Sequence, residues 1–340
     1  MKNKEFDDIM NEITKGLTGD IQTDFNYLQD QMERYKNHKY GQEVIRACGR
    51  LVYELIPEDK KKEFDDATKG DRNKFEESLK KVRFYQFEKN YDKALELIEK
   101  MVSEFEEAGF CKDDAVSEYH TFREPMEEII YCELFDQQKE VRPGIINMSD
   151  MYLQYGSILI DVKRWEDAEK ALKKAMKWNP TYAMLAFEHA ECFKIRGMLE
   201  EYKKYTREII KIIFRPNDLA RYYRNLGYYY VEVKDYKTAV SCFLYSLIFE
   251  KSNMVQSELY YISQQIGELY NPSDEELSSC LESHDIPLEP DIEILKIAYG
   301  YGMHYYEEKN MEAAKYFLEI FAGFIDDEEV NKILEEIQKN

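Results

Sequence analysis

The amino-acid sequence predicts an all-α protein built as a solenoid of antiparallel helix hairpins. A spaced pattern of small and large residues occurs four times along the 340-residue chain, and self-similarity of this kind is the signature of a repeat array. Proline and glycine are scarce, at 8 and 14 residues, which favours helices over a loop-rich or β-sandwich fold. Hydrophobic residues make up 44% of the chain and charged residues 34%, as in folded proteins.

The repeated pattern defines four clear units and predicts weaker units between them. The clear units occupy residues 75–108, 149–182, 220–253 and 295–328. The large residues that open their second helices lie 74, 71 and 75 residues apart, at Tyr91, Trp165, Tyr236 and Met311. Each interval is close to two repeats of ~34 residues plus a short loop, so we expect a degenerate unit within each interval.

Small residues are expected where the two helices of a unit cross. Two helices approach closely only where one of them presents a small side chain. We therefore expect three crossings, which pair Gly156 with Ala168, Gly227 with Ala239, and Gly302 with Ala314. Val82 holds the corresponding position of the first unit, which should pack more openly.

The pattern divides the chain into three parts. Residues 1–72 are an N-terminal helical region that is either a degenerate repeat or a cap, residues 73–328 form the solenoid, and residues 329–340 form a C-terminal capping helix. Three segments outside the clear units also carry expectations. Residues 58–72 should be a short helix or a linker, residues 112–136 a helical pair divided at Pro125, and residues 136–149 a loop.

The best unit, residues 149–182, resembles the tetratricopeptide repeat. The matching residues are Tyr152, Tyr155, Gly156, Leu159, Trp165, Ala168, Leu172, Ala175 and Pro180. The resemblance covers residues 75–328, and the alternation of strong and weak units is similar to bacterial repeat proteins of unassigned function. It implies a right-handed superhelix whose concave face, lined by the first helices, holds a peptide or a segment of a partner protein. It names no ligand.

The first helix of the 220–253 unit carries the most distinctive polar groups on the predicted groove. Arg221 and Arg224 lie three residues apart, so their guanidinium groups share one face of a helix. Together with Asn225 they could hold a carboxylate or a peptide backbone through hydrogen bonds. Three further groove residues could pack the apolar side chains of a ligand: Tyr228, Tyr299 and Met303.

The alternative role of the two arginines is structural. Each could form an ion pair within the protein, with Glu188, Glu191 or Glu258 as partner. The carboxylate clamp known in the resembled family does not fit this chain. Its positions hold Leu153, Ser157, Glu188, Arg221 and Asn225, and only the position of Arg221 matches in charge.

No enzyme signature is present, so the sequence predicts no catalytic residue, cofactor or metal site. The five histidines are far apart and form no H-E-x-x-H pattern. His189 and Cys192 lie three residues apart, but His189 falls on an inner packing position and is predicted to be a core residue. Gly300 and Gly302 lack the third glycine and the strand of a dinucleotide-binding loop, so both are interpreted as helix-crossing glycines.

Composition narrows the partners and the setting. The net charge of −21 argues against nucleic acid, which is usually bound by a basic surface. No leader sequence is recognisable and no uncharged apolar stretch reaches about 18 residues, so we expect a cytoplasmic protein without a membrane span. The six cysteines are scattered over apolar helical positions and are predicted to be free thiols.

These observations favour a non-catalytic scaffold that binds a protein or peptide in its concave groove. Two alternatives remain open. The chain could sense small signalling peptides and act through an effector protein. It could also be a self-associating subunit and form a homo-oligomer, because residues 194–251 hold 12 basic against 7 acidic residues while residues 273–340 hold 18 acidic against 5 basic.

Overall fold

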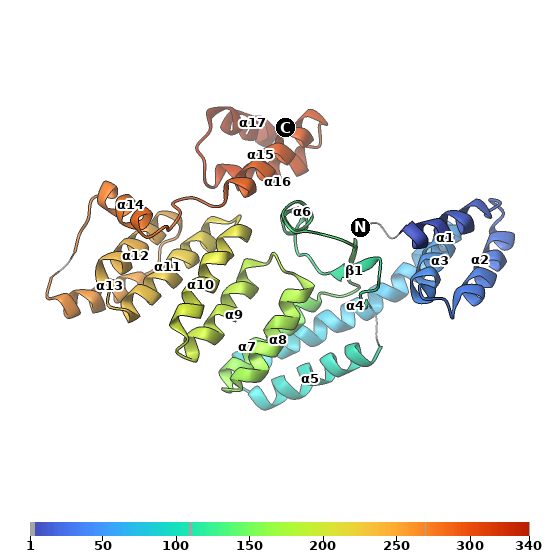
Figure 1. The fold of residues 1–340 in the computed structure, drawn as a ribbon, viewed down its shortest axis with the longest axis horizontal. Helices are drawn as coiled ribbons and strands as arrows, with labels where there is room; N and C mark the ends of the chain where they lie inside the picture. The colour runs from blue at the N-terminus through green and yellow to red at the C-terminus, as the bar shows by residue number, and fades with distance from the viewer. Residues whose placement is uncertain (1–3, 109–110, 269, 340) are drawn as a thin grey trace. The chain divides into compact units, whose positions relative to one another are not determined.

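The computed structural model describes residues 4–108, 111–268 and 270–339. The first three residues of the predicted N-terminal region lie outside this description. The chain forms two compact units (Figure 1). Unit 1 comprises Met1–Phe122 and Asp136–Asn179, and unit 2 comprises Arg123–Phe135 and Pro180–Asn340. The predicted all-α helical-repeat fold is confirmed, since the two short strands of unit 1 are the only strands among the described residues.

Unit 1 begins with a small helical bundle of α1 (Lys4–Lys15), α2 (Ile21–Tyr35) and α3 (Gly41–Leu55). Its core contains Phe6, Ile13, Leu28, Val44, Ala47 and Cys48. The side chain of Asp20 accepts a hydrogen bond from the Thr23 amide at 2.9 Å and so caps the start of α2. The hydrophobic periodicity of residues 1–56 is therefore that of three packed helices.

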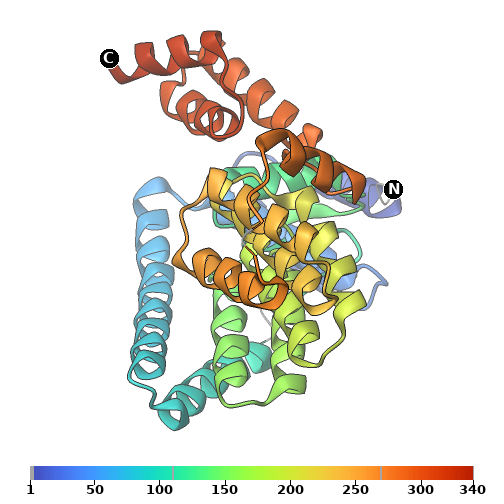
Figure 2. The same ribbon diagram turned by 90° about the vertical axis from the view of Figure 1, so that its left-hand side faces the viewer.

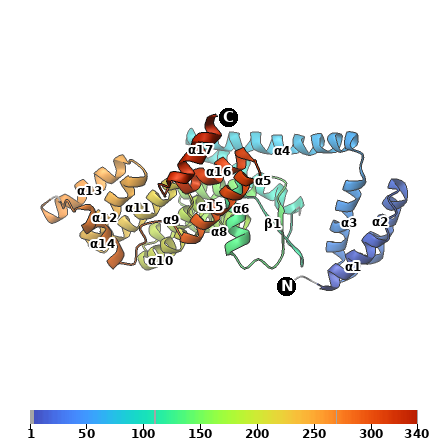
Figure 3. The ribbon, with the colours of Figure 1, turned by 90° about the horizontal axis from the view of Figure 1, so that it is seen from above.

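The next helix is longer than the sequence suggested. Helix α4 (Glu58–Phe87) has 30 residues, is drawn as one long rod in Figure 3, and runs across the predicted boundary at residue 72. It is followed by α5 (Tyr91–Ala108). Of the two alternatives predicted for residues 58–72, a short helix or a linker, the helix is confirmed, and it is part of a longer one. The segment holds no proline, and its lysines and glutamates favour helix.

Residues 112–143 depart most from the prediction. Instead of a helical pair they contain β1 (Ser117–His120) and a single helix, α6 (Pro125–Leu134). The predicted loop at 136–149 contains β2 (Glu140–Pro143), which pairs in parallel with β1 so that Ser117 lies opposite Glu140. Pro143 restricts the preceding Arg142 to an extended backbone, and strands of four residues are too short to show an alternating pattern.

Unit 1 ends with the helix hairpin α7 (Met148–Asp161) and α8 (Trp165–Trp178). Unit 2 contains α6 and a series of hairpins, of which α9 to α13 lie side by side in chain order (Figures 1 and 2). The helices are α9 (Ala183–Ile195), α10 (Leu199–Ile209), α11 (Pro216–Glu232), α12 (Tyr236–Phe249), α13 (Asn253–Ile266), α14 (Asp274–Ser283), α15 (Ile292–Glu307), α16 (Met311–Ala322) and α17 (Glu328–Lys339), with a 3-10 turn at Ile210–Ile212.

All four clear units share one turn geometry. Their first helices end in a residue with a left-handed backbone: Lys89, Lys163, Lys234 and Lys309, with φ between 57° and 63°. The amide of the following residue then donates to the carbonyl five residues earlier, at 2.8 to 2.9 Å. This is a Schellman-type helix end. Its recurrence at the four predicted places shows that the sequence pattern is a structural repeat.

The helix crossings occur at the predicted glycines, and the nearest neighbour of each is a large side chain of the second helix. At Gly156 the predicted partner also lies at the crossing, since an added β-carbon would be 3.5 Å from the Ala168 carbonyl oxygen. A β-carbon added to Gly156, Gly227 or Gly302 would lie 2.8, 2.8 or 2.6 Å from the nearest side-chain atom. Those atoms belong to Leu172, Phe243 and Leu318, each four residues after the alanine that was predicted to face the glycine. The alanines are buried one turn earlier on the second helix. The glycine makes room for the large side chain itself.

Gly300 is not a crossing glycine, contrary to the prediction. A β-carbon at Gly300 would meet nothing within 4 Å, although Gly302 lies only two residues further along the same helix. Because glycine weakens a helix interior by roughly 0.5–1 kcal/mol relative to alanine, Gly300→Ala should raise the free energy of unfolding by about that amount.

Gly302→Ala should have the opposite effect. Its β-carbon would contact the Leu318 side chain at 2.6 Å and the Leu318 backbone nitrogen at 3.2 Å, and such overpacking costs about 1–3 kcal/mol. Urea denaturation of both variants, followed by circular dichroism, provides the comparison. Equal changes in the free energy of unfolding for the two variants would contradict the helix crossing assigned to Gly302.

Candidate functional site

Four of the six predicted site residues line one cavity of about 310 Å³ in unit 2. They are Arg221, Arg224, Asn225 and Tyr228, all on α11. The other lining residues come from three further helices: Glu191 and Lys194 of α9, Phe243 of α12, and Met254 and Glu258 of α13. The cavity therefore lies where the first helices of three consecutive hairpins meet.

Helix α11 is held in place by the face that points away from the cavity. Tyr222, Tyr223 and Leu226 are fully buried there. The Tyr223 hydroxyl donates to the Pro287 carbonyl at 2.7 Å, and its ring lies 4.9 Å from that of Tyr245. Since residues at i, i+3, i+4 and i+7 share one helix face, anchoring this side presents the predicted polar residues together on the other.

Both arginines of the cavity already have a carboxylate partner. Arg221 Nη2 lies 2.9 Å from Glu188 Oε1, and its guanidinium also sits 4.9 Å from the centre of the Phe187 ring. Arg224 Nη2 lies 2.7 Å from Glu250 Oε2. The structural alternative is thus confirmed for Arg221 with Glu188. Arg224 pairs with Glu250, which the sequence did not indicate as its partner.

Two hydrogen-bond donors of the cavity residues remain unsatisfied among the described residues. Arg224 Nη1 and Asn225 Nδ2 are buried and have no hydrogen-bond partner there. Asn225 is 8% exposed. Leaving a buried donor unpaired costs about 1–3 kcal/mol.

The remaining charged residues that line the cavity are Glu191, Lys194 and Glu258. Lys194 Nζ lies 3.2 Å from Glu191 Oε2 and 4.1 Å from the centre of the Tyr228 ring. Burial, and the neighbouring Glu232 and Glu191, raise the pKa of Tyr228, so its hydroxyl stays protonated. Glu258 has no ion-pair partner within the described part of the chain.

Exposed apolar side chains lie beside the cavity. Met184 of α9 is 37% exposed and approaches Arg221, with 3.1 Å between its sulfur and Nη1. Met254 and Tyr261 of α13 are 50% and 47% exposed. Flexible methionines suit a surface that adapts to the side chains of a partner.

Tyr299 and Met303 do not line this cavity. Both are on α15. The Tyr299 ring lies 5.3 Å from that of Phe321, and Met303 packs on the core that joins α16 to α17. The structure therefore brings four of the six predicted residues together and places these two in the next hairpin of unit 2.

Sequence reasoning named Glu258 of α13 only as a possible ion-pair partner of the arginines, and it missed Met254. Met254 and Glu258 are spaced four residues apart, as first-helix groove residues should be, and this spacing was the available signal. The segment 254–294 contains three prolines and no clear repeat, so the groove positions were not extended to it.

A second polar cluster joins α12 to α14 without forming a catalytic triad. His284 Nε2 lies 3.3 Å from both Asp235 Oδ2 and Thr238 Oγ1, and Nδ1 lies 3.0 Å from the Cys280 carbonyl. In a catalytic relay the carboxylate and the nucleophile contact opposite ring nitrogens. Here they share one nitrogen, so the cluster acts as a helix cap and a link between helices.

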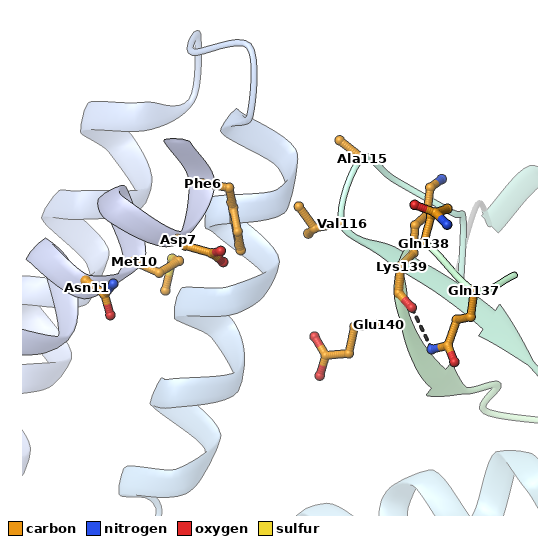
Figure 4. Close-up of a pocket in the computed structure, with 10 residues that line it drawn as sticks. All are labelled: Phe6, Asp7, Met10, Asn11, Ala115, Val116, Gln137, Gln138, Lys139 and Glu140. Carbon is orange, nitrogen blue, oxygen red and sulfur yellow. Dashed lines mark hydrogen bonds between the residues drawn. The ribbon is translucent and has the colours of Figure 1, made fainter. Parts of the chain in front are cut away.

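A larger cavity, of about 700 Å³, lies in unit 1 between α1 and the two strands (Figure 4). Phe6 and Val116 approach it from opposite sides, and the Gln137 side chain donates to the Lys139 carbonyl at 2.7 Å. Arg46 of α3, 2.6 Å from Asp114, ties the bundle to the loop before β1. No sequence pattern had indicated this cavity.

The predicted core histidine and free thiols are confirmed. The His189 ring is buried between Phe193 and Tyr205, at centroid distances of 5.2 and 4.9 Å. All six cysteines are free. Within the described ranges, no three His, Cys, Asp or Glu side chains are grouped to hold a metal ion, and no described helix has the length and apolar character needed to cross a bilayer.

Asp218, near the start of α11, gives the folding stability of unit 2 a pH dependence. Burial raises the pKa of its carboxyl to about 6, against the lowering effect of Arg215 and Arg221. The ordinary value, near 3.8, applies to the unfolded chain. Folding therefore carries the full cost of burying this charge above pH 6, and the cost disappears as the pH falls from 6 towards 4.

Asp218→Asn should accordingly stabilise unit 2 at pH 7 by about 3 kcal/mol. The difference in the free energy of unfolding between this variant and the unmodified chain should shrink towards zero at pH 4. Urea titrations at pH 7 and pH 4 measure it. A constant difference at both values would contradict the burial of this charge.

No family model and no curated protein matches the chain. Among solved structures, it is similar to YrrB, described as a TPR protein with an unusual peptide-binding site, at 11% identity over 74% of this chain and 96% of that one, with a TM-score of 0.36. It is also similar to MamA, at 12% identity over 59% and 90% with a TM-score of 0.35, and to PilF of Pseudomonas aeruginosa, at 19% over 56% and 83% with a TM-score of 0.32.

The hairpins, their common turn and the glycine crossings define an all-α helical-repeat protein, as the sequence predicted.

Proposed function

We propose that unit 2 is a non-catalytic binding module that holds a segment of a partner protein across α9, α11 and α13. The observation that carries this proposal is the convergence of Arg221, Arg224, Asn225 and Tyr228 on one cavity.

The contacts available to such a segment are of two kinds. Met184, Met254 and Tyr261 offer exposed apolar surface for its side chains, and the cavity offers hydrogen bonds at its centre. Interfaces of this type concentrate their affinity in a few desolvated central contacts surrounded by a rim. A small signalling peptide would use the same contacts. The scaffold and the peptide-sensor alternatives therefore differ in the size of the bound molecule, a protein or a free peptide.

We also propose a reducing, cytoplasmic setting. Six free thiols, four of them buried, suit a compartment in which disulfides do not form.

The test uses photoreactive cross-linking from defined positions. A photoreactive amino acid replaces Met184 in one variant and Met254 in another, and each full chain is irradiated in lysate of its source cells. Both variants should capture the same protein. The capture should be lost when Arg221→Glu and Arg224→Glu are added, because these changes reverse the charge of the cavity wall.

A third variant, with the photoreactive group at Ile292, serves as the control. Ile292 is 58% exposed at the start of α15 and does not line the cavity. Equal capture from position 292, or capture that survives the charge reversal, would refute the proposed surface. Capture of a free peptide instead of a protein would support the sensor alternative.

A further inference from the structure

Two aromatic side chains of α4 are exposed next to each other. Phe84 is 59% exposed and Phe87 is 82% exposed. They lie three residues apart, so they share one face of the helix. Protein surfaces normally carry single, scattered apolar side chains, whereas neighbouring ones are typical of a surface that contacts another molecule.

The repeat shows what this face of α4 is for. Phe84 lies five residues before Lys89, the left-handed residue that ends the first helix. The residues in the same place in α7 and α11 are Ile158 and Tyr229, which are 0% and 5% exposed. The Tyr229 hydroxyl donates to Glu200 of α10, the second helix of the preceding hairpin, at 2.7 Å. Phe84 therefore lies on the face against which a preceding hairpin packs.

No such hairpin covers α4 in the part of the chain that the structure describes. The helices before it, α1 to α3, pack around a core of their own. A bare end of a repeat array normally has a polar outer face. In α15 the same place is also exposed and holds a polar residue, His304. The apolar Phe84 at this end indicates a face that another helix covers.

The charged residues beside Phe84 indicate which helix that is. Lys80 lies one turn before Phe84 and Glu88 one turn after it; both are exposed, and neither has an ion-pair partner among the described residues. When two α4 helices cross at Phe84 in antiparallel directions, Lys80 of each lies beside Glu88 of the other. A parallel crossing would bring like charges together. The face is therefore complementary to itself, as a two-fold contact requires.

We propose that the outer face of α4 pairs with the same face of a second copy of this chain. Phe84 packs on Phe84 of the second copy at the two-fold axis, and Phe87 packs on the aliphatic part of Lys81 of the second copy. Lys80 and Glu88 form two symmetric ion pairs at the rim. Two crossing helices bury less than the ~1,200 Å² of a standard interface, so the dimer should form reversibly at micromolar concentrations. This inference is independent of the α11 cavity.

Sedimentation equilibrium of the full chain, below and above micromolar concentration, measures the association. Phe84→Glu together with Phe87→Glu should raise the dissociation constant at least about tenfold, because it removes apolar contact from both copies and brings like charges together. Ile292→Glu is the matched control, since Ile292 is 58% exposed on α15, and it should leave the association unchanged. Because all three residues are exposed, the fold should persist, and circular dichroism verifies this.

Reversal of the rim charges tests the antiparallel arrangement. Lys80→Glu and Glu88→Lys, each made alone, place like charges at both rim contacts and should weaken the association about fivefold or more. A mixture of the two variant chains should associate again, because each Lys80→Glu chain then meets lysines of the Glu88→Lys chain at both contacts.

A chain that stays monomeric at every concentration would overturn the inference, as would association that survives the two phenylalanine changes. Association that survives them but is lost in high salt would indicate the oppositely charged segments 194–251 and 273–340 instead. Variant chains that do not associate when mixed would overturn the antiparallel pairing. A monomeric chain that captures a different protein from a photoreactive group at position 87 would show that a partner's helix covers the face. None of these results changes the capture expected from Met184 and Met254, which tests the proposed function separately.

Discussion

Tyr223→Ala is expected to lower the free energy of unfolding of unit 2 by about 3–5 kcal/mol, the range for deleting a buried aromatic ring. Tyr223 is fully buried, and its ring lies 4.9, 5.4 and 5.9 Å from those of Tyr245, Tyr222 and Phe249. It also ties α11 to the chain before α15 through the Pro287 carbonyl. Removing it opens a cavity behind the helix that carries the candidate site.

The position of the two tryptophans makes this measurement selective. Trp165 and Trp178 are both in unit 1, so tryptophan fluorescence follows unit 1 while circular dichroism follows the helices of both units. Urea denaturation should shift the circular-dichroism transition and leave the fluorescence transition in place. Tyr223→Phe is the matched control and should cost about 1 kcal/mol, the value of a lost hydrogen bond.

A Tyr223→Ala variant within 1 kcal/mol of the unmodified chain would show that α11 is not anchored as described.

The second large effect concerns binding. Arg221→Glu together with Arg224→Glu should weaken the binding of the captured partner by about 2–5 kcal/mol, which raises Kd at least about thirtyfold. The two changes replace donors by acceptors, and they place new carboxylates beside Glu188 and Glu250. Calorimetry or surface plasmon resonance with the cross-linked partner measures the loss.

Lys296→Glu is the matched control for this change. Lys296 lies on α15, is exposed, and pairs with Glu293 at 2.8 Å, so its reversal alters the net charge by the same amount per residue but not the cavity. It should leave Kd within about twofold, because exposed pairs contribute little. An equal loss from Lys296→Glu would indicate long-range electrostatics instead of a local contact.

The repeat could be predicted because it is local. The turn that ends each first helix depends on neighbouring residues, so it recurs wherever the sequence frame recurs, as at Lys234 and Lys309. The crossing glycines were also visible, since only a small residue leaves room for Phe243 or Leu318. Which side chain fills that space depends on how the second helix is rotated, so the sequence indicated the alanine but not the larger residue four positions later.

The strands and the full site depend on contacts that are distant in sequence. Ser117 pairs with Glu140, although α6, which belongs to unit 2, separates the two residues in the sequence. No local sequence pattern predicts such a pairing. In the same way, Arg224 forms an ion pair with Glu250, which lies at the far end of the following helix. Glu258 joins the cavity from a hairpin whose repeat has degenerated, so the groove frame alone recovered only the part of the site on α9 and α11.

Hydrogen exchange of the backbone amides, with and without the bound partner segment, tests the central claim most directly. Binding across the α11 cavity should slow exchange in α9, α11 and α13, and should leave α15 to α17 unchanged. Protection confined to α15–α17 or to unit 1, with none in α11 and α13, would contradict the account.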